Sequence, residues 1–203
     1  MKIIAKNIHK NFNKRLVLRD ISFELNDVDS LVITGPNGSG KTTLVKIICG
    51  LLSPNKGSID FFDDKYALER DTANRHIGLV SPYLQLYKDL TAWENLSFFA
   101  KARHGKIDKN RIFDLLRLVG LKNREHDALK TYSSGMLQRI KYVAALYHLP
   151  RVLVLDEPTA NLDEAGKQIV HNIIKEQKKD KILIIATNEA EEIAFAAQRV
   201  EIV

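Results

Sequence analysis

A glycine-rich loop contains the residues most able to do chemistry, and residues 35–42 read Gly-Pro-Asn-Gly-Ser-Gly-Lys-Thr. The three glycines let the backbone turn so that successive amides point into one concavity, which suits phosphate oxygens. Lys41 supplies a positive charge for the β- and γ-phosphates, and the hydroxyl of Thr42 can coordinate Mg²⁺. A helix expected from about Gly40 adds the positive end of its dipole. The pattern predicts a nucleotide-binding P-loop formed by Gly35, Pro36, Asn37, Gly38, Ser39, Gly40, Lys41, Thr42 and Thr43.

Two adjacent carboxylates, Asp156 and Glu157, follow the apolar run Val-Leu-Val-Leu at 152–155. We expect this run to be a buried strand whose end faces the P-loop on the neighbouring strand. Asp156 would then hold Mg²⁺ through water, while Glu157 would orient or deprotonate the attacking water. The alternative is an exposed acidic turn after a core strand, and the P-loop upstream makes this the weaker interpretation. Together the two motifs predict a P-loop protein that hydrolyses a nucleotide.

The elements that must position these residues are short apolar runs that alternate with helical patterns. This order is typical of an α/β domain with a largely parallel sheet. Buried strands are expected at 31–34, 152–155 and 182–186, with a last short strand at 199–203 and no further domain after it. The first 26 residues and residues 57–62 indicate additional, antiparallel strands beside this sheet.

The middle of the chain has helical patterns instead of strands. Thr91 and Glu94 have the spacing of a capping box, which starts a helix. A second helix is expected at about 108–119, because its apolar residues share one face and Gly120 provides a stop. We therefore predict one domain over 1–203, with its core at about 1–89 and 131–203 and an inserted helical subdomain at about 90–130.

At this point the sequence resembles the ATP-binding subunit of an ABC transporter, over essentially the whole chain. Residues 132–139 read Tyr-Ser-Ser-Gly-Met-Leu-Gln-Arg, which is similar to the LSGGQ signature of that family followed by its Gln-Arg pair. Residues 158–163 are similar to the D-loop of the family, which crosses the dimer interface. The resemblance implies a P-loop NTPase core with a mostly parallel sheet, an antiparallel β subdomain and the helical subdomain. It also implies ATP and Mg²⁺ as cofactors.

The resemblance implies further site residues and partners. In the family, two chains pair head to tail, as a homodimer or a heterodimer, and the signature of one chain contacts the γ-phosphate held by the other. In this sequence the signature residues are Ser133, Ser134, Gly135 and Met136. Phe12 occupies the place of an aromatic residue that stacks on adenine, although a lone phenylalanine is as often a core residue. A separate transmembrane subunit would be the partner, at the inner face of the cell membrane, and nucleic acid is not expected.

Three departures from the family pattern bear on catalysis. Asn188 occupies the place of a histidine that contacts the γ-phosphate, and an amide can donate a hydrogen bond there but carries no proton or charge. Pro82 occupies the place of a glutamine that approaches Mg²⁺. Gln85 could still reach the metal if the loop shifts, or it is a solvated surface residue. The signature has Ser134 for a glycine and Met136 for a glutamine. We expect intact ATP binding and slow but real hydrolysis, with Glu157, Lys41 and Asn188 in the catalytic set.

Length and composition narrow the class of protein. The chain has 203 residues, a net charge of +6 and one cysteine, which excludes a disulfide framework and a Cys-rich metal site. Its longest stretch without Asp, Glu, Lys or Arg, residues 76–87, is far below the roughly 20 residues that cross a bilayer. The favoured class is the energising subunit of a membrane transporter or exporter. The alternatives are a soluble ATPase of the same family that acts on nucleic acid or the ribosome, and a hydrolysis-poor regulatory subunit.

The positive charge is concentrated in the predicted helical subdomain. Residues 101–130 contain nine Lys or Arg and four Asp or Glu, a net charge of +5, so the rest of the chain is nearly neutral. The nucleotide site uses none of these nine cations. We therefore expect a basic face that suits anionic lipid headgroups or the acidic loops of a membrane partner.

Overall fold

The apolar runs form a five-stranded sheet in the computed structural model, which describes residues 1–13 and 15–203, with only the backbone at His104. Its strand order is β6-β7-β8-β3-β9, and every pairing is parallel. The α/β class with a mostly parallel sheet is therefore confirmed. The strands are β3 (Ser30–Thr34), β6 (Ile77–Val80), β7 (Val152–Asp156), β8 (Ile182–Ala186) and β9 (Gln198–Glu201).

Both faces of this sheet are covered by apolar packing. Within β7, Val152 and Val154 belong to the core around helix α1 (Lys41–Ile48), whereas Leu153 and Leu155 belong to a second core on the other face. Consecutive residues of a strand point to opposite faces, so a continuous apolar run fills both cores. The second core is completed by α5 (Ser134–Leu146) and α6 (Glu164–Gln177).

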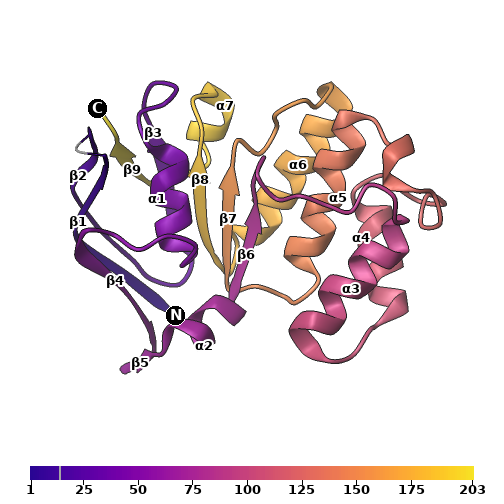
Figure 1. Cartoon of the computed structure of the whole chain (residues 1–203), viewed down its shortest axis with the longest axis horizontal. Coiled ribbons are helices and arrows are strands. Elements are labelled where there is room, and N and C mark those ends of the chain that lie inside the picture. The colour runs from indigo at the N-terminus through magenta and orange to yellow at the C-terminus, as the bar shows by residue number, and fades with distance from the viewer. Residues whose placement is uncertain (14) are drawn as a thin grey trace.

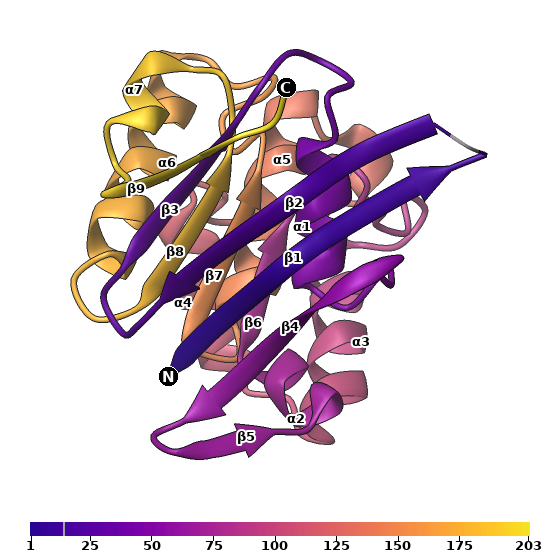
Figure 2. The same cartoon turned by 90° about the vertical axis from the view of Figure 1, so that its left-hand side faces the viewer.

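The antiparallel strands form a separate sheet with the order β2-β1-β4-β5. Its members are β1 (Lys2–Phe12), β2 (Arg15–Leu25), β4 (Lys56–Asp63) and β5 (Tyr66–Leu68). Helix α1 lies between this sheet and the parallel one, as Figure 1 shows at the left of the molecule and Figure 2 shows from the side. Helix α1 is thus packed between two sheets, and the hydrophobic core around it fixes its position.

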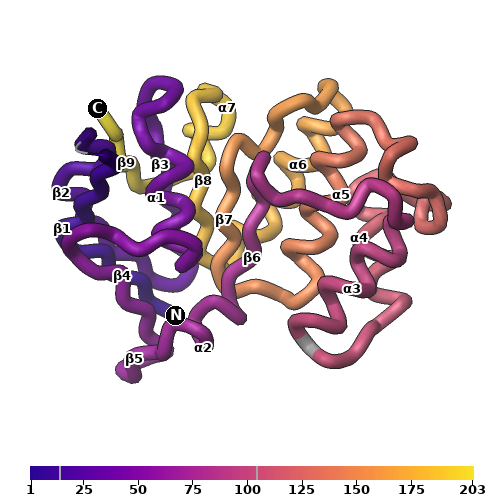
Figure 3. Tube along the Cα trace, in the orientation of Figure 1, coloured from indigo at the N-terminus to yellow at the C-terminus, as the bar shows by residue number. Residues whose placement is uncertain are grey.

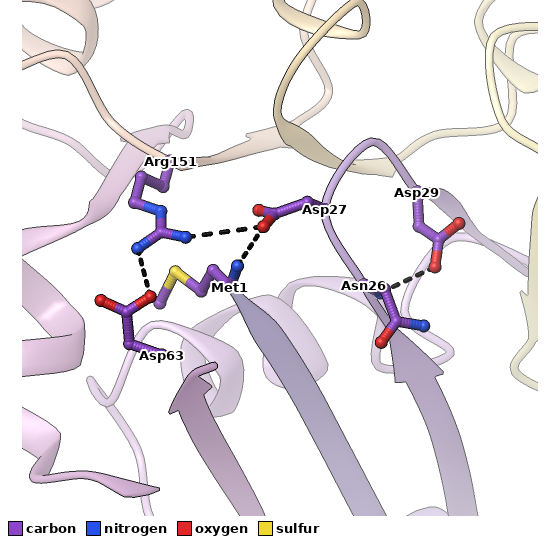
Figure 4. A network of polar contacts seen from close by, with 6 residues as sticks. All are labelled: Met1, Asn26, Asp27, Asp29, Asp63 and Arg151. Carbon is purple, nitrogen blue, oxygen red and sulfur yellow. Dashed lines mark hydrogen bonds and ion pairs between the residues drawn. The ribbon is translucent and has the colours of Figure 1, made fainter. Parts of the chain in front are cut away.

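An ionic network joins the two sheets at one edge of the molecule (Figure 4). Arg151, which precedes β7, contacts Asp63 at the end of β4 at 2.7 Å and Asp27 before β3 at 3.5 Å. The ammonium group of Met1 also contacts Asp27. The hydrogen bond from Arg151 lowers the pKa of Asp63. These partly exposed pairs set the orientation of the antiparallel sheet and contribute little stability each.

The predicted helical segment contains α3 (Ala92–His104), α4 (Lys109–Leu118) and a short 3₁₀ turn (Leu129–Thr131). The capping box of Thr91 and Glu94 is confirmed, since each side chain bonds the backbone amide of the other. The two ends of the segment meet, because the amide of Leu129 donates to the carbonyl of Leu90 at 2.9 Å. Figure 3 shows α3 and α4 on the side of the molecule away from the antiparallel sheet. The division into core and helical subdomain stays our prediction.

Reciprocal arginine contacts hold α4 against α5. Arg111 of α4 donates to the carbonyls of Leu146, at 2.9 Å, and Tyr147 at the end of α5. Arg139 of α5 donates to the carbonyl of Val119, at 2.9 Å, at the end of α4. The last carbonyls of a helix lack partners within the helix and form the negative end of its dipole, so cations are favoured there. The helix that begins at the signature is therefore tied to both ends of α4.

Several elements escaped the sequence analysis. Strand β6, strand β5, helix α2 (Arg70–Arg75) and helix α7 (Ala190–Ile193) were not predicted. Strand β6 contains Gly78, a poor strand former, but a Cβ at this position would lie 2.6 Å from the carbonyl oxygen of Ala145. The expectation that β7 neighbours the P-loop strand is wrong, because β8 lies between β7 and β3.

Candidate functional site

The P-loop has a backbone that only glycine can adopt at two positions. Gly35 has a φ of 146°, and a Cβ there would lie 2.3 Å from the carbonyl oxygen of Ile202. Gly40 has a φ of 118°, and a Cβ there would lie 2.7 Å from Val17 Cγ1. Gly40 is the N-cap of α1 and no side chain caps the helix, so its first amides remain available to an anion.

Lys41 lies inside this loop. Its side chain is buried, and Nζ donates to the carbonyl of Gly35 at 2.7 Å and of Pro36 at 3.3 Å. The ammonium group therefore occupies the space that the loop encloses. Asn37 and Gly38 at the tip of the loop are exposed. Ser39 Oγ is buried and has no hydrogen-bond partner within residues 1–13 and 15–203.

Asp156 ends β7 and meets the first turn of α1. Thr42 Oγ1 donates to Asp156 Oδ2 at 2.9 Å, and Ser81 Oγ donates to the same oxygen at 3.3 Å. Asp156 Oδ1 is buried and has no hydrogen-bond partner in the part of the chain that the structure describes. Burial raises the pKa of Asp156, and the bonds from Thr42 and Ser81 oppose this. Oδ2 is therefore held by two hydrogen bonds, whereas Oδ1 accepts none from the described residues.

This arrangement fits a magnesium ion that is shared with phosphates. A hydroxyl that donates its proton to Asp156 keeps lone pairs for a cation, and Asp156 Oδ1 offers a carboxylate oxygen. Mg²⁺ in nucleotide sites takes only one or two protein ligands and completes its shell with phosphates and water. No cluster of three or more His, Cys, Asp or Glu able to hold a metal occurs among the described residues.

Glu157 has an unusual backbone conformation. Its φ is 52°, in the left-handed region, and its amide donates to the carbonyl of Ala186 at 2.9 Å. Such strain in a non-glycine residue concentrates at functional sites. Burial raises the pKa of Glu157, and the nearby positive charge of Lys41 opposes the rise. Asp156 is still part of β7, whereas Glu157 has left the strand in a left-handed conformation, so the two carboxylates can take different roles.

Asn188 contacts the P-loop from the segment after β8. The amide of Gly35 donates to Asn188 Oδ1, and Asn188 Nδ2 donates to Asn37 Oδ1, both at 3.4 Å. The structure thus brings together the P-loop, Thr42, Asp156 and Asn188, although they are far apart in the sequence.

The signature residues form the start of α5. Ser133 is the N-cap, and its Oγ accepts a hydrogen bond from the amide of Met136 at 3.2 Å. Ser134 is exposed. A Cβ on Gly135 would lie 3.2 Å from the carbonyl oxygen of Asn161, so the signature packs against the D-loop. The expected helix start is therefore present, and its first turn is accessible.

Two predicted residues lie apart from this cluster of contacts. Phe12 is at the end of β1 with 45% of its surface exposed, and Lys10 Nζ lies 5.2 Å from the centre of its ring. Gln85 is exposed, and its side chain has no hydrogen-bond partner in the part of the chain that the structure describes. Pro82 is exposed as well. The adenine and metal roles of Phe12 and Gln85 stay predictions.

Sequence reasoning missed two residues beside Asp156. Ser81 approaches the carboxylate directly, and Lys141 Nζ donates to the carbonyl of Ser81 at 3.0 Å. A polar residue at the carboxyl end of a parallel strand is a recognisable signal, because ligand sites gather at that edge. Ser81 follows the apolar run Ile-Gly-Leu-Val at 77–80, so this signal was present.

The burial of Glu157 predicts a specific pH dependence of stability. Its pKa lies above the usual 4.5 in the folded state, so the folded protein binds the proton more tightly than the unfolded chain. This tighter proton binding stabilises the folded state fully below pH 4.5, and the stabilisation is lost as pH rises through the folded-state pKa of Glu157. Glu157→Gln should therefore be more stable than wild type near neutral pH in EDTA, with an advantage that disappears in acid.

Thermal unfolding across this pH range is the measurement, with the exposed Glu69→Gln as the control. An advantage of Glu157→Gln that persists unchanged in acid would contradict the assigned burial of this carboxylate.

Comparison with known proteins places this geometry in a family. A family model described as "ABC transporter" matches residues 18–160. The uncharacterized ABC transporter ATP-binding protein YdbJ of Bacillus subtilis is 36% identical over 200 residues, which cover 98% of this chain and 65% of that protein. The linearmycin resistance ATP-binding protein LnrL of the same organism is 36% identical, with the same coverage of both chains. The lantibiotic transport ATP-binding protein SrtF of Streptococcus pyogenes is 33% identical over 90% of this chain and 78% of its own length.

Solved structures agree with the fold. An ATP-binding subunit of an ABC transporter has a TM-score of 0.85 and 26% identity, covering 100% of this chain and 86% of its own. A dimeric ATP-binding cassette in a post-hydrolysis state, bound to ADP and Pi, has a TM-score of 0.86 and covers 98% and 94%. At 23% identity, the second likeness supports the fold alone.

The chain spans 65% of the length of the first curated relatives that it matches. Among the described residues, no helix combines the length and the apolar character that crossing a bilayer demands. The family model covers more than half of the chain, the curated relatives align with nearly all of it, and the P-loop, signature and carboxylate motifs occur in the family's order. The chain therefore belongs to the ABC transporter family, as an ATP-binding domain.

Proposed function

We propose that this chain binds and hydrolyses ATP and thereby energises an ABC-type membrane transporter. The observation that carries the proposal is the contact of Thr42 with Asp156 at the mouth of the P-loop. It places a hydroxyl, an open carboxylate oxygen and the free amides of α1 around one point. That point suits the β- and γ-phosphates of ATP with their metal ion.

The residues of the P-loop would bind the phosphates. The amides at the start of α1 receive the negative charge, and Lys41 exchanges the carbonyls of Gly35 and Pro36 for phosphate oxygens. Thr42 and Asp156 would hold Mg²⁺, which supplies charge neutralisation of the phosphates when bound. Asn188, beside Gly35, is placed to donate a hydrogen bond to the terminal phosphate.

Glu157 would act as the general base. A carboxylate whose pKa is raised by burial accepts a proton more readily than an exposed one, which favours deprotonation of the attacking water. The backbone beyond it is held, because Gln138 Nε2 and Tyr142 Oη donate to the carbonyl of Pro158 at 3.2 and 2.9 Å. These bonds keep the turn after Glu157 from relaxing its left-handed conformation.

Dimer closure would complete the site. The accessible first turn of α5, with Ser133 and Ser134, would bind the γ-phosphate of ATP held by a partner chain. A cassette with the same fold forms a dimer in its ADP- and Pi-bound state. A homodimer and a heterodimer both satisfy the geometry. ATP binding would close the dimer, and hydrolysis would open it.

A transmembrane partner would dock at a groove next to the helical segment. The groove has a volume of about 500 Å³ between α2, α3 and α5 and beyond the end of α1. Its apolar lining comes from Cys49, Leu51, Ile77, Leu79, Leu84, Leu96, Phe99, Ala100, Ala102, Ala144 and Ala145. Arg75 and Arg103 also line it. An apolar groove of this size suits a short apolar segment of a membrane protein at the inner face of the membrane better than it suits nucleic acid.

Several basic side chains of residues 101–130 have partners within the chain. Arg103 donates to the carbonyl of Ile77 at 2.9 Å, and Arg111 caps α5. Other partners within the chain are Asp114 for Arg117, Asp127 for Arg124, Asp89 for Lys130 and the Trp93 ring for Lys109. The side chains of Arg117, Arg124 and Lys130 are still more than half exposed, so the basic face stays a prediction beside the proposed apolar groove.

Replacement of the base tests the catalytic proposal. Glu157→Gln should lower ATP turnover at least about a hundredfold, because general-base catalysis contributes about 10² to 10⁴. ATP binding should persist, since the amide is isosteric and the P-loop is untouched. Steady-state phosphate release is the measurement, with the exposed Glu69→Gln as the matched control. Equal turnover of Glu157→Gln and wild type would show that the base is another group.

We predict slow ATP turnover in the wild type, because Asn188 occupies the place of a histidine. The amide cannot carry a proton or a charge to the γ-phosphate, so Asn188→His should raise kcat several-fold, with little change in ATP affinity. Pre-steady-state and steady-state assays of both proteins separate the two quantities. An unchanged or lower kcat in Asn188→His would mean that this position does not limit hydrolysis.

A charge placed in the groove tests the transport proposal. Leu51 is 64% exposed, so Leu51→Glu should leave folding and ATP binding intact while weakening association with a membrane subunit. Affinity purification from detergent-solubilised membranes of the native cells is the measurement. Tyr66→Glu, on β5 away from the groove, is the control. Nucleic acid in place of a membrane protein in the wild-type eluate would refute the transporter role.

A further inference from the structure

The pairing of β6 with β7 places Ser81 beside Asp156. The register matches Val80 with Leu155, so the next residue of each strand lies at the same level. Ser81 is only 5% exposed, and its Oγ donates to Asp156 Oδ2 at 3.3 Å. Parallel pairing therefore delivers a buried hydroxyl to the carboxylate that faces the P-loop.

The Ser81 hydroxyl is oriented by its own surroundings. The amide of Tyr83 donates to Ser81 Oγ at 3.3 Å. This bond occupies a lone pair and leaves the hydroxyl proton for Asp156. Thr42 and Ser81 both donate to Oδ2, whereas the buried Oδ1 has no hydrogen-bond partner among the described residues.

Lys141 anchors the backbone that carries this hydroxyl. Its Nζ donates to the carbonyl of Ser81 at 3.0 Å and to that of Pro82 at 3.5 Å. Lys141 lies two turns into α5, the helix whose first residues are the signature. The amide of Leu84 donates to the same Ser81 carbonyl at 3.1 Å, so Lys141 adds a second donor to a turn that the loop also closes itself.

We propose that Ser81, held by Lys141, is a positioning residue that fixes Asp156 so that Oδ1 faces the Mg²⁺ of bound ATP. The inference rests on the proposed function, because it concerns the same metal. It gives the loop after β6 a contact with the metal carboxylate that does not require Gln85, which is exposed. Ser81 touches neither the phosphates nor the reacting atoms in this role.

The experiment measures how much Mg²⁺ strengthens nucleotide binding. The full chain is titrated with a non-hydrolysable ATP analogue, once with Mg²⁺ and once with EDTA, and the ratio of the two affinities is the readout. Groups that orient a metal ligand typically change metal affinity tenfold or more. Ser81→Ala should therefore reduce the ratio about tenfold, with the affinity in EDTA unchanged. Lys141→Met should reduce it in the same direction.

Two further variants separate positioning from a general structural effect. Ser81→Thr keeps the hydroxyl and should restore the ratio. Ser97→Ala removes another buried serine hydroxyl, one without a hydrogen-bond partner in the described residues, and should leave the ratio unchanged. Should Ser81→Ala fail to fold, Lys141→Met carries the same expectation by itself.

The outcomes distinguish this inference from the proposed function. A wild-type ratio in folded Ser81→Ala, or in Lys141→Met, would overturn the inference and leave ATP binding by the P-loop standing. A ratio that Ser81→Thr fails to restore would also overturn it. A wild-type chain that binds the analogue in neither buffer would overturn the proposed function, and the inference with it.

Discussion

The hydrogen bond between Thr42 and Asp156 is the contact on which the rest of the site depends. It joins the first turn of α1 to the end of β7, although β8 lies in the sheet between β7 and β3, the strand that precedes the P-loop. The geometry holds because α1 is packed between two sheets and cannot tilt without disturbing the larger core. A buried carboxylate is costly unless it is bonded, so the two hydroxyls that donate to Asp156 also make its burial tolerable.

The site is assembled from the ends of strands. The P-loop follows β3, Asp156 ends β7, Ser81 follows β6 and Asn188 follows β8. The carboxyl ends of parallel strands meet at one edge of a sheet, where the following segments can carry polar groups while the strands stay apolar. This division explains how a sheet with an apolar core on each face can present a charged, strained and partly buried cluster at a single edge.

The sequence was most informative where chemistry restricts the residue type. The P-loop glycines were predictable because their φ values and close contacts admit no side chain, and the capping box of α3 because its two partners are three residues apart. Strand β6 was missed because glycine is a poor strand former, and Gly78 is required by a close contact with α5 that is distant in the sequence. The contact of Ser81 with Asp156 was missed for the same reason, since it depends on strand register. The contacts of Arg103 and Arg111 with backbone carbonyls are equally non-local and were not predicted, while the basic face stays a prediction.

The central claim is that the P-loop, Thr42 and Asp156 together hold ATP with its metal ion. A crystal structure of the chain with Mg²⁺ and a non-hydrolysable ATP analogue tests it most directly. The account predicts that Lys41 Nζ leaves the carbonyls of Gly35 and Pro36 for the phosphates. It also predicts that Mg²⁺ lies about 2.1 Å from Thr42 Oγ1, on the side of Asp156 Oδ1. Nucleotide bound elsewhere, or a metal ion that does not contact Thr42, would contradict the account.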